Sequence, residues 1–117
     1  MKKMIVTVMF GVLLGIDGPK IYISSDMEGV VGAVTGEQLG PLGFEYERFR
    51  KFMTAEVKAA IEGARSAGAR EILVADSHGN GQNLLIDELP KDVQIVRSWP
   101  RPPVSYTHLR AHETDSY

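Results

Sequence analysis

The sequence predicts an α/β fold built on a βαβ unit, with a parallel sheet and one long crossover helix. Three observations support this prediction. A short strand pattern occupies 20–25, a helical pattern follows over 44–67, and a second strand pattern occupies 70–75. Two strands that are joined by a helix in this way lie parallel and take a right-handed crossover.

The two strand predictions depend on residue type. Residues 20–25 read Lys-Ile-Tyr-Ile-Ser-Ser, and residues 70–75 read Arg-Glu-Ile-Leu-Val-Ala. Both segments are rich in the β-branched, aromatic and aliphatic residues that favour strands. Between the first strand and the helix, Gly29–Gly43 is a glycine-rich stretch for which we predict no regular element.

The helix prediction depends on spacing. Apolar residues recur at steps of three and four, which predicts one buried stripe. Its members are Phe49, Phe52, Met53, Val57, Ala60, Ile61 and Ala64, and Gly68 stands where a helix-terminating glycine is expected. The charged residues of this segment are expected to form a solvated face.

Further elements follow the second strand. We predict a short helical segment at 84–89, which ends at Pro90, and a third strand at 93–96. A proline-rich, extended stretch occupies 98–103. The main domain is therefore expected to cover residues 20–103.

Residues 1–19 are interpreted as a leader segment or signal peptide. Lys2 and Lys3 precede an apolar run over 4–15, as in a signal peptide, and the run is too short to span a bilayer. Residues 15–18 lack the small-x-small pattern of a cleavage site. The protein is therefore expected to be cytoplasmic, or exported if residues 1–19 act as a signal.

Residues 104–117 are interpreted as a non-native tail. Residues 104–114 resemble a transposon adapter of DNA sequencing libraries, translated in one reading frame. His108 and His112 have a spacing that can hold zinc on a helix. Because both lie in the expected tail, we assign them no metal role.

Composition limits the classes of partner and metal. The formal net charge is −2, so no basic face is expected for nucleic acid or an anionic membrane. The chain has no cysteine, which excludes disulfides and thiolate metal sites. A metal would be held by Asp, Glu and His, which suit zinc, manganese or magnesium.

Candidate ligands follow the first two strands. Asp26 and Glu28 are two residues apart, so in extended backbone they point to the same side, and Gly29 lets the chain turn away. Two adjacent carboxylates repel each other unless a cation lies between them or one is protonated. His78 follows the second strand, and parallel strands bind ligands at their carboxyl ends.

Asp26, Glu28 and His78 are therefore expected to converge into a set that can bind zinc. The alternatives are a solvated acidic loop for the carboxylates and a surface or capping role for the histidine. Asp76 is expected to cap the following turn rather than to bind a metal. Asn80 and Asn83 are expected to cap the short helix, with contact to substrate as the alternative.

With these motifs in order, residues 20–96 resemble the zinc-dependent D-aminopeptidase family. The resemblance rests on three segments, 21–30, 45–56 and 72–78. It implies a two-zinc site in which Asp26 bridges the ions, Glu28 binds one ion and His78 binds the other. It also implies hydrolysis of N-terminal residues from short peptides, with metal-activated water as the nucleophile, and assembly into homo-oligomers.

The resemblance further implies that the chain is a truncated fragment of a larger three-layer domain. The family's remaining ligands, a His and a Glu, and its catalytic His are expected downstream, so no catalytic residue is assigned and the fragment is expected to be inactive. The alternative is a non-catalytic α/β metal- or phosphate-binding module. Against phosphate binding, the glycines after the first strand are more widely spaced than in a nucleotide-binding loop. They are Gly29, Gly32, Gly36, Gly40 and Gly43.

Overall fold

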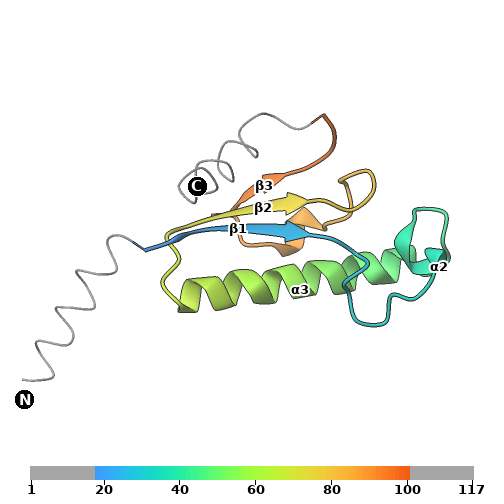
Figure 1. Ribbon diagram of the computed structural model, residues 1–117, viewed down its shortest axis with the longest axis horizontal. Helices are drawn as coiled ribbons and strands as arrows, with labels where there is room; N and C mark the ends of the chain where they lie inside the picture. Colours follow the sequence, from blue (N-terminus) through green and yellow to red (C-terminus); the bar gives the residue numbers. More distant parts are fainter. Residues whose placement is uncertain (1–17, 101–117) are drawn as a thin grey trace, which may run out of the picture.

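A three-stranded parallel sheet and one long helix make up the described part of the chain. The computed structural model describes residues 18–100. The strand order is β1-β2-β3, and α3 lies along one face of the sheet (Figure 1). Residues 1–17 of the expected leader and the whole expected tail, with His108 and His112, lie outside the described residues.

Pairing of the strands positions the site. β1 (Lys20–Ser25) and β2 (Glu71–Asp76) are parallel and in register, so that Ser25 lies beside Asp76. β3 (Gln94–Val96) pairs with the other side of β2, also in parallel. The predicted α/β class and the parallel βαβ unit are confirmed. Because β1 and β2 end side by side, the segments that follow them leave the sheet at the same edge.

The long helix α3 spans Tyr46–Ser66, close to the predicted range. Four members of the predicted stripe are buried and pack toward the sheet: Phe49, Met53, Val57 and Ile61. They meet Ile72 and Val74 of β2, together with the partly buried Ile21 and Ile23 of β1. Burial of this apolar surface stabilises the βαβ unit.

Two members of the predicted stripe are exposed, and a third, Ala64, is partly buried. Phe52 is 39% exposed and Ala60 is also exposed. The described elements therefore leave part of this stripe uncovered. The Phe52 ring instead packs edge-to-face on Phe49, with 5.2 Å between ring centroids, and Arg48 lies over its outer face.

The end of α3 follows the prediction. Gly68 has φ of 94°, a left-handed conformation that glycine adopts without steric cost. Its N–H donates to the carbonyl of Arg65 at 2.9 Å, which satisfies one of the last helix carbonyls. The helix therefore stops where the chain must turn back into β2.

A short helix, α2 (Gly36–Leu39), was not predicted. Thr35 and Gln38 form a capping box, in which the Gln38 side chain accepts the Thr35 N–H at 2.8 Å. The Gln38 amide also donates to Glu45, which joins α2 to the start of α3. The Thr-x-x-Gln signal was present but was hidden among glycines.

The connection between β2 and β3 contains a single turn of 3-10 helix, η1 (Ile86–Glu88). It lies inside the range predicted to be helical, and Leu84 and Leu89 on either side of it are buried. Within residues 18–100, no helix has both the length and the apolar character that a membrane crossing requires.

The depth of Ile61 in this core leads to a stability prediction. Ile61 has no exposed surface, so Ile61→Ala leaves a cavity and should lower the free energy of unfolding by about 2–5 kcal/mol. Phe52→Ala removes a larger side chain but should cost clearly less, because that ring is partly in water. Urea unfolding followed by circular dichroism measures both values, and equal losses would contradict the packing described here.

Candidate metal centre

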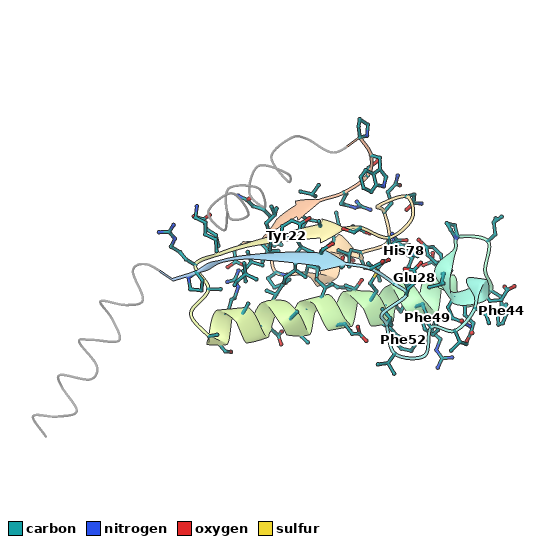
Figure 2. The ribbon with its side chains drawn as sticks, in the orientation of Figure 1. Tyr22, Glu28, Phe44, Phe49, Phe52 and His78 are labelled. Atoms are coloured by element: carbon teal, nitrogen blue, oxygen red, sulfur yellow. The ribbon has the colours of Figure 1, made fainter. Side chains whose placement is uncertain are left out.

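Three side chains meet where β1 and β2 end. Nδ1 of His78 lies 3.0 Å from Oδ1 of Asp26 and 3.0 Å from Oε2 of Glu28. One ligand atom from each residue can be chosen so that all three lie within 4.8 Å of one another. Figure 2 shows Glu28 and His78 side by side at this edge of the sheet. The convergence expected from the sequence is therefore observed.

Local structure after β1 explains why both carboxylates face outward. Met27, between them, is completely buried, whereas the side chains of Asp26 and Glu28 are 58% and 57% exposed. The Met27 N–H donates to Oδ1 of Asp26 at 2.9 Å, and the Val30 N–H donates to the Met27 carbonyl at 3.0 Å. Burial of the apolar residue thus directs its two acidic neighbours to the same outer side.

The expectation for Gly29 is not met in detail. Glycines with positive φ are found elsewhere in the described chain, and Gly29 is not among them. A Cβ at this position would meet no atom within 4 Å. The turn therefore does not depend on the special freedom of glycine, because the hydrogen bond from Val30 to Met27 closes it.

His78 is held in a fixed orientation. Its side chain is only 8% exposed, and Nε2 lies 2.6 Å from the backbone carbonyl of Leu39, at the end of α2. A carbonyl can only accept, so Nε2 carries the proton in this contact. In the neutral ring, Nδ1 then presents its lone pair toward Asp26 and Glu28, an arrangement that needs a second proton or a cation.

The pKa directions agree with this geometry. Burial alone lowers the pKa of His78, but the hydrogen bond to Leu39 and the carboxylates of Asp26 and Glu28 outweigh it, so the pKa is raised. The pKa of Asp26 is lowered chiefly by a hydrogen bond that the Glu28 carboxyl group donates when it is protonated. His78 and the Met27 N–H add to this effect, against that of burial. Without a metal, a proton on Nδ1 offsets the carboxylate charge.

The donor set fits a divalent cation. It comprises one imidazole nitrogen and two carboxylate oxygens, all of types that zinc accepts. The backbone carbonyl on Nε2 is the kind of outer partner that orients metal-binding histidines. Because the two carboxylates face solvent, the cluster is open on one side to further ligands.

Asp76 lies beneath the cluster and does not join it. Its carboxylate is fully buried and turns into the following loop. Oδ2 accepts the N–H of Asn83 at 2.6 Å and the N–H of Leu84 at 2.8 Å. The prediction that Asp76 caps this turn is confirmed.

The capping prediction for the two asparagines is wrong. The residue before η1 is Leu85, and no side chain caps that turn. Asn80 instead accepts the Gln82 N–H at 2.9 Å inside its own loop. Asn83 forms hydrogen bonds with Asp76, with the His78 carbonyl and with Tyr46.

The sequence also did not indicate that the backbone carbonyl of Leu39 would orient His78. A backbone acceptor leaves no signal in residue type.

Fold and site together define an α/β protein with a carboxylate–histidine cluster at the carboxyl edge of a parallel sheet. The sequence profile of the D-aminopeptidase family matches residues 20–115. This chain belongs to that family.

Two relatives are similar to most of the described chain. A D-aminopeptidase of Bacillus subtilis (strain 168) is 34% identical over 83 residues, which cover 71% of this chain and 30% of the relative. The solved structure of the Zn-dependent D-aminopeptidase DppA from Bacillus subtilis, described as a self-compartmentalizing protease, matches with a TM-score of 0.66 at 34% identity. That match covers 68% of this chain and 29% of DppA. The chain thus spans less than a third of either relative's length.

The raised pKa of His78 predicts how stability depends on pH in the metal-free chain. A group whose pKa is raised on folding stabilises the fold fully below its unfolded pKa, here near 6.5, and this contribution is lost as pH rises through the folded pKa. With a chelator present, the advantage of the native chain over His78→Gln in free energy of unfolding should therefore be largest below about pH 6.5 and should shrink as the pH rises above it. An advantage that grows with pH would contradict the assigned contacts.

Proposed function

We propose that Asp26, Glu28 and His78 bind zinc in a metal-dependent aminopeptidase that hydrolyses N-terminal residues of short peptides. The observation that carries this proposal is the imidazole of His78, whose Nδ1 is directed at two carboxylates by a hydrogen bond on Nε2. The family membership and the names of the two relatives support zinc and aminopeptidase activity.

Each residue of the cluster has a distinct part in the proposal. Asp26 and Glu28 supply two negative charges that offset the charge of the ion, and Asp26 is proposed to bridge two zinc ions in the intact protein. His78 supplies Nδ1 from a nearly buried ring, so the surrounding protein, rather than solvent, holds the imidazole in place. Zinc supplies Lewis acidity, which polarises a scissile carbonyl and makes water more acidic.

We further propose that the 117-residue chain alone is inactive. Within residues 18–100, Asp26, Glu28 and His78 form the only group of three or more potential His, Asp or Glu ligands. The chain spans about 30% of the curated relative, and we place the remaining ligands and the catalytic groups in the rest of the intact protein. The preference for D-residues and assembly into homo-oligomers are proposed by analogy with the relatives.

The alternative was a non-catalytic α/β metal- or phosphate-binding module, and phosphate binding receives no support from this edge of the sheet. The loop after β1, where a phosphate would bind in a nucleotide-binding fold, carries the exposed carboxylates of Asp26 and Glu28. These charges repel an anion and attract a cation.

Zinc affinity tests the ligand assignment. Asp26→Asn and His78→Gln should each weaken zinc binding by about 100-fold or more, since loss of an outer partner alone costs roughly 10–100-fold. Competition with a chromophoric chelator measures the affinity of the full chain. Asp92→Asn is the control, because Asp92 is exposed and pairs with Arg65, near the other end of α3. Native affinity in both ligand variants would overturn the proposal.

Activity is tested separately. With zinc present, the chain should release no product from a chromogenic D-aminoacyl anilide, because we place the catalytic groups outside it. A full-length family member, assayed in parallel, shows that the substrate and conditions are adequate. Turnover by the 117-residue chain that disappears in Asp26→Asn would show that the chain is itself an enzyme and would refute its proposed inactivity.

A further inference from the structure

We propose that Asn83 is a positioning residue of this metal centre, and that it acts by holding the loop that carries His78. The inference rests on the proposed zinc site. Asn83 is only 2% exposed and lies between β2, the His78 loop and α3. A buried carboxamide is costly unless its donors and acceptor are all paired, and here they are.

The side chain of Asn83 connects three parts of the fold. Nδ2 donates to Oδ1 of Asp76 at 2.9 Å and to the carbonyl of His78 at 2.5 Å. Oδ1 accepts the hydroxyl of Tyr46, in the first turn of α3, at 2.5 Å. One side chain thus ties the end of β2 and the backbone of a proposed ligand to the long helix.

The backbone of Asn83 is fixed as well. Its N–H donates to Asp76, and its carbonyl accepts Nε of Arg50 at 2.8 Å. The carbonyl of His78 also accepts the N–H of Gly81 at 2.8 Å, which closes the loop between them. The N–H and the carbonyl of Asn83 are therefore both restrained. Because its side chain bonds to the His78 carbonyl, Asn83 in turn restrains the backbone that carries the imidazole.

Two contacts together set the direction of the imidazole. Asn83 holds the His78 backbone, and the carbonyl of Leu39 holds Nε2. With both ends restrained, Nδ1 is directed at Asp26 and Glu28 before any cation binds. A pre-oriented ligand loses less conformational freedom on binding, which raises affinity without any new contact to the ion.

The test compares Asn83→Leu with a matched variant in the full chain. Leucine has a similar size but cannot donate to Asp76 or His78. Thr54→Val is the control, because Thr54 is 1% exposed and its hydroxyl accepts the N–H of Leu85 and donates to the carbonyl of Arg50, with no hydrogen bond to His78 or Asn83. Both variants lose buried hydrogen bonds, but only Asn83→Leu should affect the site.

Zinc affinity is measured by chelator competition, and the ligand geometry by the absorption spectrum of bound Co²⁺. Asn83→Leu should weaken zinc binding about 10–100-fold and alter the Co²⁺ spectrum, whereas Thr54→Val should match the native chain in both. Native affinity and spectrum in Asn83→Leu, or an equal loss in Thr54→Val, would overturn the positioning role.

Two further outcomes remain decisive. If circular dichroism shows that Asn83→Leu does not fold, Tyr46→Phe replaces it, because this change removes only the hydroxyl that donates to Asn83. A several-fold loss of zinc affinity then supports the proposal, and native affinity rejects it. If the native chain binds no zinc, the proposed metal centre itself fails and the positioning role fails with it.

Discussion

The structure depends on the parallel, in-register pairing of β1 with β2. This pairing brings Ser25 beside Asp76, and the Ser77 N–H extends the ladder by donating to the Ser25 carbonyl at 2.8 Å. As a result, two loops about 50 residues apart in sequence leave the sheet together. A slip of the register by one residue would turn the apolar side chains of β1 away from α3. Packing of Ile21 and Ile23 against the core therefore helps to fix the register, and with it the positions of the site residues.

The carboxylates at this edge of the sheet are of two kinds, exposed and buried. Asp26 and Glu28 are exposed and meet a single imidazole, whereas Asp76 is fully buried and bonds to backbone and amide donors. The buried carboxylate is satisfied by the loop itself and organises it. The exposed carboxylates are satisfied in part by His78, which makes them the groups suited to bind a cation.

Several neighbouring elements converge on His78 without being ligands. α2 supplies a backbone carbonyl, and α3 supplies Tyr46 and Arg50, which reach the loop through Asn83. The glycine-rich segment, for which no regular element was predicted, therefore contributes to the site, because α2 ends at Leu39, whose carbonyl contacts Nε2 of His78. An outer layer of this kind is typical of metal centres, where it sets the orientation of each ligand.

By itself, the sequence determined the α/β class, the order of the three strands and the long helix, and the placement of Asp26, Glu28 and His78 at one edge, because strand and helix periodicities are local and the parallel topology is restricted. Tertiary structure alone decided the tautomer of His78, the exposure of Phe52 and the contacts of Asn83. The surroundings of His78 and Asn83 come from segments distant in sequence, a carbonyl of α2 and the phenol of Tyr46. Phe52 is exposed because the described elements do not cover it. Backbone acceptors carry no signal in residue type, and the apolar pattern of a helix does not show which of its members the sheet will cover, so both become visible only when the chain is folded.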